Sequence, residues 1–351
     1  MLGILGLFGA VFAGFMADGV IATKTKLDGD DTAEAEDNVT ESDEETGDTV
    51  DLLDVASQNQ APDVDASGTE SSDSPFPTPL DVELTGSGDD DILTGEAGAD
   101  TIDGGDGDDL LDGRDGDDVI NGDNGEDYIG GGAGDDDLRG GAGNDVVDGH
   151  DGNDLLTGGA GDDSLSGHMD DDYLNGDEGD DTLVGGSGAD TLAGGAGNDW
   201  LAGGFDDDEL FGDEGEDTLD GNAGDDTLWG VDAENPEDSQ GSDFLNGGTG
   251  DDTLMIGAGD WAHGGEGEDS FALNSWIGSD DLAHIMDYEP SEDEIVVLYD
   301  ANAHPDPHVE LLTDEDSDDA TIVLDGVPLA VIANGANLTV DALKLTPSNI
   351  F

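Results

Sequence analysis

The chain has 351 residues, and its 93 Asp and Glu against 5 Lys and Arg give a formal net charge of −88 at pH 7. This charge repels polyanions, so no nucleic-acid partner is expected. Aromatic residues make up 5% and glycines number 59, which excludes the large close-packed core of an ordinary enzyme. Without cysteine the chain has no disulfide, no thiolate nucleophile and no Cys-ligated zinc. The 34% apolar content is nevertheless too high for a chain that is disordered throughout.

Residues 1–22 form an apolar N-terminal segment that has no charged side chain before Asp18 and is followed by Lys24 and Lys26. Three interpretations stay open: a cleaved secretory signal, a membrane anchor, and an apolar stretch that packs on something else. A secretory signal carries positive charge before its apolar run, whereas these lysines follow it. An anchor would be long enough if Asp18 lay near the membrane interface. Membrane contact through residues 1–22 is therefore undecided.

Residues 23–84 mix Asp, Glu, Ser and Thr with few large apolar residues, and a Pro-rich run occupies residues 75–79. No helical or alternating hydrophobic period extends over this stretch. Its composition predicts a disordered acidic linker.

A nonapeptide repeat organises the next part of the chain and runs unbroken through 15 units from Gly95 to Trp229. The first position is Gly and the sixth is Asp in all 15 units, the fourth is Gly in 13, and the eighth is always aliphatic. Residues 231–240 break the phase and are expected to bulge from one turn. Weaker copies flank the run at Gly88, Asp90 and Ile92; at Gly241, Asp243 and Leu245; at Gly250, Asp252 and Leu254; and at Gly267, Asp269 and Phe271.

The residue types of the repeat indicate a chemistry. Glycines at positions one and four, and often two, permit positive φ angles and sharp turns in which carbonyl oxygens and the Asp carboxylate converge. Hard oxygen ligands of this kind suit calcium. Positions seven to nine predict a three-residue extended segment whose middle residue points inward. Two units then make one coil, with turns on two edges and about 13 gaps between stacked turns.

The repeat resembles that of the hemolysin-type calcium-binding family, the RTX proteins, whose unit is Gly-Gly-x-Gly-x-Asp-x-U-x with U aliphatic. The resemblance implies an all-β fold, a parallel β-roll or RTX solenoid, that binds multiple calcium ions. Its ligands would be the sixth-position Asp and turn carbonyls of neighbouring coils. The predicted metal ligands are Asp90, Asp100, Asp109, Asp118, Asp127, Asp136, Asp145, Asp154, Asp163, Asp172, Asp181, Asp190, Asp199, Asp208, Asp217, Asp226, Asp243 and Asp252.

The same resemblance implies a route out of the cell. Its members are type I secretion substrates with an uncleaved C-terminal signal, so the secretion machinery is an expected partner and the extracellular space the expected location. The apolar, charge-poor residues 343–351 are compatible with that signal. One inward aliphatic side chain per repeat unit is too little to hold an acidic roll together, so folding is expected to require calcium.

Residues 85–271 are assigned to the calcium-binding β-roll and residues 272–351 to a C-terminal β cap that closes its open end. Strand patterns occur at 270–273, 294–299 and 321–332, the last with an Asp-Gly turn at 325–326. The flank at 281–288 is similar to the segment that follows the roll in serralysin-like proteins.

No catalytic site is expected, because the chain lacks His-Glu-x-x-His, Gly-x-Ser-x-Gly and a phosphate loop with its Lys. Fifteen equivalent carboxylates also argue against a glycosidase pair, which needs one distinctive environment. The preferred function is a secreted, non-enzymatic calcium-binding protein with a matrix, surface or adhesive role. The alternatives are a membrane-active RTX toxin-like protein and a carrier module for a separate enzyme.

Several side chains depart from the repeat. His150 and His168 occupy second positions two units apart, and we interpret them as residues that tolerate the positive φ of a Gly slot rather than as a transition-metal site. Asp170 and Asp206 replace the fourth Gly, which is expected to weaken ion binding there. Three aromatic residues at seventh positions are expected to face away from the aliphatic row: Tyr128, Tyr173 and Trp200.

Overall fold

The computed structural model describes residues 80–231, 241–274, 282–302, 304–313 and 317–348. They lie within one compact unit, residues 73–351. The predicted apolar segment 1–22 and nearly all of the predicted linker 23–84 lie outside the described residues. Among the described residues, no helix has the length and apolar character needed to cross a membrane.

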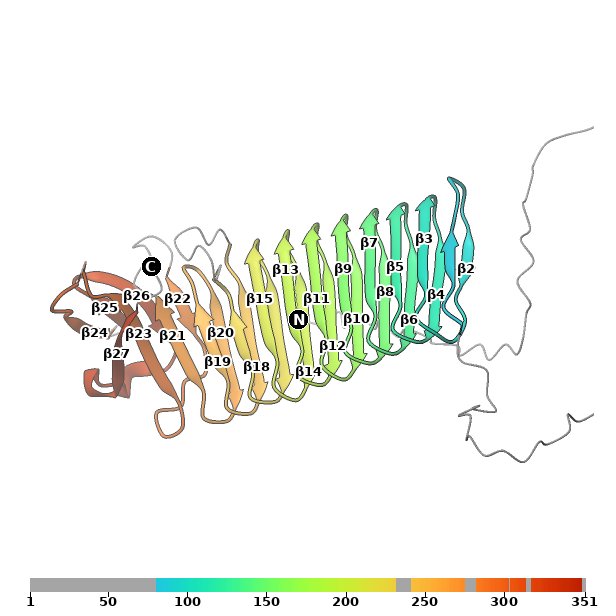
Figure 1. The fold of residues 1–351 in the computed structure, drawn as a ribbon. Helices are drawn as coiled ribbons and strands as arrows, with labels where there is room; N and C mark the ends of the chain where they lie inside the picture. Colours follow the sequence, from blue (N-terminus) through green and yellow to red (C-terminus); the bar gives the residue numbers. More distant parts are fainter. Residues whose placement is uncertain (1–79, 232–240, 275–281, 303, 314–316, 349–351) are drawn as a thin grey trace, which may run out of the picture. The chain divides into compact units, whose positions relative to one another are not determined.

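The described chain is almost entirely β-structure, arranged as two sheets that face each other along a roll (Figure 1). Sheet A contains, in spatial order, β1 (Glu83–Thr85), β3 (Thr101–Asp106), β5 (Val119–Asn124), β7 (Asp137–Ala142), β9 (Leu155–Ala160), β11 (Tyr173–Glu178), β13 (Thr191–Ala196), β15 (Glu209–Glu214), β17 (Thr227–Trp229), β19 (Thr253–Ile256), β21 (Ser270–Asn274), β23 (Glu294–Asp300) and β27 (Leu343–Ser348). Sheet B contains β2 (Ile92–Thr94), β4 (Leu110–Asp115), β6 (Tyr128–Ala133), β8 (Val146–Asp151), β10 (Ser164–Met169), β12 (Thr182–Ser187), β14 (Trp200–Phe205), β16 (Thr218–Ala223), β18 (Phe244–Thr249), β20 (Trp261–Glu266), β22 (Ala283–Ile285), β26 (Val327–Ile332), β25 (Ala320–Leu324) and β24 (Val309–Thr313).

Successive strands alternate between the sheets, so two nonapeptides make one coil. Thr101 of β3 pairs with Val119 of β5, and Leu165 of β10 pairs with Leu183 of β12, so each strand pairs with the strand two units further along. The pairing is parallel throughout the roll, which confirms the predicted fold class. The edge at which sheet A strands lead to sheet B strands is called the first edge here, and the opposite one the second edge.

The strands of the roll are longer than the three residues expected. Most have six residues, from the seventh position of one unit to the third position of the next, as in β12. The ladder passes over the first-position glycine, Gly185, and resumes at Gly186, which pairs with Gly204. Positive φ angles at second positions let the chain continue in register with the next coil, so only positions four to six remain as the turn.

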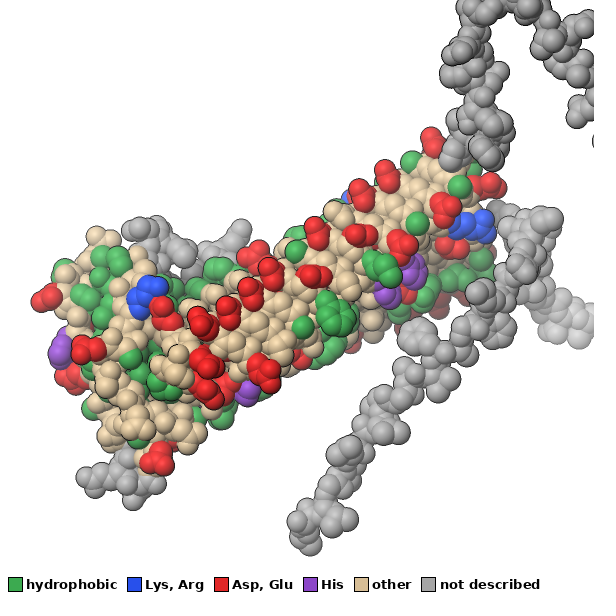
Figure 2. Space-filling view, turned by 90° about the horizontal axis from the view of Figure 1, so that it is seen from below, with side chains coloured by type: hydrophobic (Ala, Val, Ile, Leu, Met, Phe, Trp, Pro, Cys, Tyr) green, Lys and Arg blue, Asp and Glu red, His purple; other side chains and the backbone are tan. Residues whose placement is uncertain are grey.

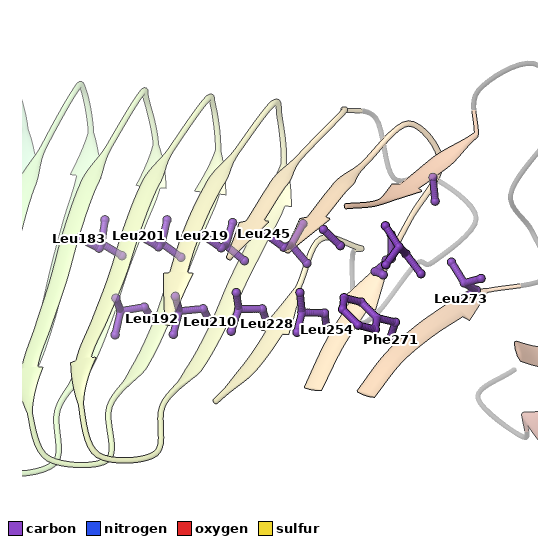
Figure 3. Packing of buried hydrophobic residues seen from close by; sticks show 14 of the residues in the cluster. Leu183, Leu192, Leu201, Leu210, Leu219, Leu228, Leu245, Leu254, Phe271 and Leu273 are labelled. Atoms are coloured by element: carbon purple, nitrogen blue, oxygen red, sulfur yellow. The ribbon is translucent and has the colours of Figure 1, made fainter. Parts of the chain in front are cut away.

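The core is the double row of eighth-position side chains that the sequence predicts. Leu183, Leu201 and Leu219 from sheet B face Leu192 and Leu210 from sheet A, and all five are fully buried (Figure 3). Positions seven and nine point outward on each strand, as the alternation of a strand requires. The roll is thus one aliphatic layer thick, with polar turns on both edges and acidic side chains in rows along its length (Figure 2).

Two irregularities change the coil length without interrupting the sheets. Thr218 pairs with Phe244 because the segment that breaks the repeat is inserted between them, which makes this coil longer than the regular one. Apart from Val231, the predicted bulge at residues 231–240 lies outside the described residues. Phe244 in turn pairs with Trp261, so the following coil is one residue shorter than the regular coil.

The C-terminal cap continues both sheets. β23 and β27 extend sheet A in parallel, and β22 and β26 extend sheet B before β25 and β24 add antiparallel strands. The expected strands are present, and the Asp325-Gly326 turn joins β25 to β26 with φ angles of 50° and 86°. Two 3₁₀ turns, η2 (Gly335–Asn337) and η3 (Val340–Ala342), lead to β27, and cap side chains such as Ile295 join the core of the roll.

Candidate metal centres

Positions four to six of each unit form a tight turn between two strands. In the turn at residues 179–181, Gly179 has a φ of 146° and its N–H donates to the carbonyl of Ala196 in the next coil, at 2.8 Å. A Cβ on Gly179 would lie 1.8 Å from the carbonyl oxygen of Gly161 in the preceding coil. Glycine at this position therefore lets turn carbonyls approach the neighbouring turn closely.

The first-position glycine is required for a different reason from the one expected. Gly185 and its equivalents do not have a positive φ, so backbone conformation does not demand glycine there. A Cβ on Gly185 would instead lie 2.4 Å from Oδ2 of Asp190 and 2.7 Å from the carbonyl oxygen of Gly203. The Asp carboxylate oxygen lies beside every first-position glycine of the 15 units, and beside 11 of them a carbonyl oxygen of the next coil converges with it. Any side chain there would occupy that space.

The sixth-position aspartates form a continuous ladder along each edge. Oδ1 of Asp181 accepts the backbone N–H of Asp163 in the preceding coil at 2.7 Å, and Oδ1 of Asp199 accepts that of Asp181 at 2.7 Å. The second edge has the same arrangement, for example from Asp172 to Asp154 at 2.8 Å. Each side chain is thereby fixed in one orientation, with one oxygen already committed.

In most of these aspartates the other carboxylate oxygen has no hydrogen-bond donor; Asp100 is an exception, because its Oδ2 accepts the N–H of Glu96. Fifteen of these Oδ2 atoms are buried without a partner: those of Asp109, Asp118, Asp127, Asp136, Asp145, Asp154, Asp163, Asp172, Asp181, Asp190, Asp199, Asp208, Asp217, Asp226 and Asp252. A buried carboxylate oxygen without a donor is strongly unfavourable, because the charge has lost its water and gained nothing in return. The same arrangement in fifteen turns fits a cation as the partner of Oδ2.

The fifth-position side chains form a second ladder that runs in the opposite direction. Oδ1 of Asp162 accepts the N–H of Asp180 in the following coil at 3.1 Å, and Oδ1 of Asp180 accepts that of Asn198 at 2.8 Å. Asp and Asn are equivalent in this role, because only one side-chain oxygen is used. This ladder explains the acidic or amide residue that precedes most sixth-position aspartates.

Burial raises the pKa of most sixth-position carboxyls above the usual value of 3.8. For Asp172 the pKa rises to about 8: desolvation is the main cause, the backbone hydrogen bond from Asp154 opposes it, and repulsion from Asp190 adds to it. Burial likewise raises the pKa of Asp163 to about 7 and that of Asp127 to about 6. Without a cation, these carboxyls hold protons more tightly than free aspartate does.

The oxygen-rich surroundings fit calcium. A calcium ion in the gap between two turns would be held by Oδ2 of the sixth-position Asp together with turn carbonyls. Calcium accepts such a mixture of carboxylate and carbonyl oxygens. In the described part of the chain, no group of three or more His, Cys, Asp or Glu side chains is arranged to hold a metal ion. The other oxygen ligands available beside Oδ2 are backbone carbonyl oxygens such as that of Gly203.

The structure places 17 of the 18 predicted ligands at equivalent positions. Asp100, Asp252 and the predicted ligands between them are buried, with at most 4% of the residue exposed. Asp90 differs, because the coil register places it at the fifth position: its Oδ1 accepts the N–H of Asp108, the next fifth-position residue. Its assignment to the sixth position was wrong by one residue, since the weak copy was aligned on Gly88 instead of on the unbroken phase from Gly86.

Four ladder aspartates were not among the predicted ligands, and the last of them, Asp293, accepts the N–H of Asp269 at 3.1 Å. Asp91 takes the sixth position that was assigned to Asp90, and its N–H donates to Oδ1 of Asp109. Asp260 accepts the N–H of Asp243, in the coil that is one residue short. Asp269 accepts the N–H of Asp252; the weak copy that contains it could have identified it. Extending the nine-residue phase to the residues before Gly95 identifies Asp91 from the sequence. Asp260 cannot be identified in this way, because the coil before it is one residue shorter than the regular coil.

Other residues singled out in the sequence take the expected conformations. His150 and His168 have φ angles of 83° and 84°, and their rings stack with centroids 5.1 Å apart on the outside of sheet B. Asp170 and Asp206 have φ angles of 69° and 72° in the left-handed region. The seventh-position aromatic residues face outward, as Trp200 illustrates with 43% exposure.

Comparison with known proteins addresses the repeat itself. A family model described as the RTX calcium-binding nonapeptide repeat matches a series of overlapping segments from 85–120 to 202–231, and then 237–260. Among solved structures, the chain is similar to a hyperactive, Ca²⁺-dependent, β-helical antifreeze protein from an Antarctic bacterium, solved by X-ray crystallography. That match has 19% identity and a TM-score of 0.24, and it covers 64% of this chain and 80% of the other. No curated protein matched the chain.

Proposed function

Because the chain belongs, over residues 85–260, to the RTX calcium-binding nonapeptide repeat family, we propose that it is a secreted, non-enzymatic protein whose roll folds when it binds extracellular calcium. Its role would be in a matrix, on a cell surface or in adhesion. The observation that carries the proposal is the row of 15 buried Oδ2 atoms without a donor.

Calcium dependence follows from these oxygens. In the ion-free roll, neighbouring coils stack carboxyl groups that repel one another, and burial adds to the cost of charging them. A divalent cation in each gap reverses the sign of this interaction and supplies the missing partner of Oδ2. Binding free energy then becomes folding free energy, as in other small metal-dependent folds.

A location outside the cell suits this dependence. A chain that stays unfolded where calcium is scarce can pass through a narrow exporter, and it folds once it meets millimolar calcium. The members of the family that the repeat resembles follow type I secretion, which makes that machinery the proposed partner. The proposed C-terminal signal, residues 343–351, includes β27, which ends sheet A.

Circular dichroism during a calcium titration of the full chain tests the proposal. We expect little β signal in EDTA, a cooperative gain as calcium enters the millimolar range, and reversal when EDTA is restored. A matched titration with magnesium should give a much weaker response, because magnesium is reluctant to exchange its waters for carbonyl oxygens. A full β signal in EDTA at neutral pH would contradict calcium-dependent folding.

Location and activity need their own measurements. Fractionation of an expressing culture, with the N-terminus read by mass spectrometry, should find the protein outside the cell. Leakage of a dye from liposomes that is caused by the calcium-loaded protein would favour the membrane-active alternative. Purification together with a catalytic chain would favour the carrier alternative.

A further inference from the structure

The outer face of sheet B carries a patch that is almost uncharged. It consists of the outward residues of β10, β12, β14, β16 and β18, at the seventh, ninth, second and third positions. Asp220 is the only acidic residue among them, and its Oδ1 accepts a hydrogen bond from Asn246 at 2.8 Å. In a chain with a net charge of −88, a surface of this kind is exceptional. It is called the neutral patch below.

Large apolar side chains stand on the neutral patch. Trp200 and Phe244 occupy seventh positions and are 43% and 46% exposed. Met169 and Phe205 occupy third positions on the same sheet and are 58% and 66% exposed. Met169 and Phe205 both pair with Ser187 of the strand between them, so they are neighbours across one strand. Their clustering distinguishes this face from one with scattered surface apolar residues.

Sheet A has no equivalent face at the same height of the roll. The strand β13 carries no acidic residue at an outward position, but its neighbours β11 and β15 carry five: Asp177, Glu178, Glu209, Asp213 and Glu214. The repeat therefore accepts carboxylates at these outward positions. Their near-absence from the neutral patch is a property of that face and not of the fold.

We propose that the neutral patch is the surface through which two copies of this chain associate face to face. Electrostatics selects this occupant: on the acidic faces, two copies would bring carboxylates against carboxylates, whereas here flat, uncharged surfaces meet. Both copies contribute the same strands, so the contact is self-complementary and closes as a dimer. Packing of two sheets through their outer faces resembles the inside of a β-sandwich.

The size of the face is adequate. Five strands spaced about 4.8 Å apart and six residues long, at about 3.3 Å per residue, span about 24 by 20 Å, or roughly 480 Å² per copy. Extending the contact to Tyr128 of β6 and Trp261 of β20 raises the footprint to roughly 770 Å² per copy. The extension adds the carboxylates of Asp148, Asp151 and Glu266, of which Asp148 accepts the Tyr128 hydroxyl at 2.6 Å. Two neutral patches alone give about 960 Å² in total, at the lower end for specific protein interfaces, and two extended footprints give about 1,500 Å².

The stacked rings at and beside the two ends of the patch also favour a protein partner over a sugar. His150 stacks on His168 at 17° between planes, and Trp261 stacks on His284 with centroids 4.2 Å apart. Each pair spans adjacent strands, so the ring faces point along the roll and the ring edges point outward. Stacking on a polysaccharide requires ring faces that are exposed, whereas edges suit interdigitation with another sheet.

Sedimentation velocity of the full, calcium-loaded chain tests the proposal. We expect a concentration-dependent dimer that strengthens between about 0.05 and 0.5 M NaCl, because salt screens the repulsion between two acidic rolls. Trp200→Glu with Phe244→Glu should raise the dimer dissociation constant at least about tenfold. Tyr173→Glu, a 44% exposed aromatic on sheet A, is the matched control and should leave it unchanged. Glu209 shows that the seventh position tolerates glutamate.

Trapping with single cysteines gives an independent readout, because the chain has none of its own. Ser187→Cys on sheet B should form a covalent dimer under mild oxidation in calcium, and Ala196→Cys on sheet A should not. The proposal is overturned by a monomer at every salt concentration, by a dimer that survives both glutamates, or by a monomer that is retained on an insoluble neutral polysaccharide. Circular dichroism of each variant in calcium separates these outcomes from failure of calcium-dependent folding.

Discussion

Asp181 contacts the preceding coil through one carboxylate oxygen only: its Oδ1 accepts the backbone N–H of Asp163 at 2.7 Å, and its Oδ2 is buried without a donor. The two oxygens therefore have separate roles. The first fixes the side chain and caps an amide, and the second remains available to a cation. Asparagine at this position could still accept the backbone N–H, but it could not offer a negatively charged oxygen to a cation.

Asp181→Asn is expected to shift the calcium-dependent folding midpoint to higher calcium and to cost about 1–3 kcal/mol in saturating calcium. Its amide can keep the hydrogen bond to Asp163, but it loses the negative ligand. Asp180→Asn in the same turn is the matched control, because Asn144 already fills the fifth position of another coil and accepts the N–H of Asp162. Calcium titrations followed by circular dichroism should separate the two, and equal midpoints would contradict the assigned roles.

Gly185→Ala should destabilise the roll by more than about 2 kcal/mol, because the new methyl group would occupy the space where oxygens converge. It would lie 2.4 Å from Oδ2 of Asp190 and 2.7 Å from the carbonyl of Gly203. Ser187→Ala, two residues further on, should have little effect, because it is an outward third position and alanine already fills the equivalent position at Ala196. Urea unfolding in saturating calcium measures both. An unchanged free energy of unfolding for Gly185→Ala would show that the space beside this glycine is not needed.

Acid should partly replace calcium. The carboxyls of Asp172 and Asp208 have pKa values of about 8 in the folded roll, above the 3.8 of an unperturbed aspartate, mainly because of burial. The folded state therefore binds these protons more tightly than the unfolded state does. This stabilisation is complete below pH 3.8 and is lost as the pH rises through about 6 to 8.

In EDTA we accordingly expect β signal to appear as the pH falls from 8 towards 5, and calcium affinity to weaken over the same window because protons compete for Oδ2. Circular dichroism and isothermal calorimetry at stepped pH measure the two trends. The variant Asp172→Asn should reduce the proton uptake that accompanies acid folding. A β signal in EDTA that falls with acidification would contradict the sign.

Leu192→Ala should cost about 2–5 kcal/mol, because it leaves a cavity in the aliphatic layer between the sheets. Leu192 is fully buried, whereas the adjacent Thr191 lies on the outside of β13, so Thr191→Ala serves as the control. The core variant should raise the calcium midpoint, yet the number of ions bound at saturation, measured by calorimetry, should not change. A lower number would show that packing and ion binding are not separable.

The repeat made most of the roll predictable. Invariant aspartates and aliphatic residues at fixed spacing determined the two-unit coil, the inward row that includes Leu192, and the direction of each turn. The reason is that every unit forms the same turn and the same strand, so the assignment of positions in one unit is checked by the units on either side. The role of the fifth position was not predictable, because its hydrogen bond joins residues one full coil apart, such as Asp162 and Asp180, and is visible only once the coils are stacked.

The ends of the repeat were harder to predict for a related reason. At the start, the neighbouring Asp90 and Asp91 allow two alignments, and before Asp260 the spacing is one residue short. In both places a single residue decides which carboxylate enters the ladder. The cap was expected as strands, but its sequence has no period that would show β23 pairing with both β21 and β27. Pairing between distant segments depends on packing against the core, which a local pattern does not encode.

The sixth-position ladder continues across both the lengthened and the shortened coil, where Asp243 follows Asp217 and Asp260 follows Asp243. Coil length and edge chemistry are therefore independent variables. Whole coils could be deleted or duplicated without changing the terminal strands. Each coil would shorten or lengthen the roll by about 4.8 Å, the spacing between neighbouring strands. A fold of this kind can serve as a ruler, whose reach is set by copy number alone.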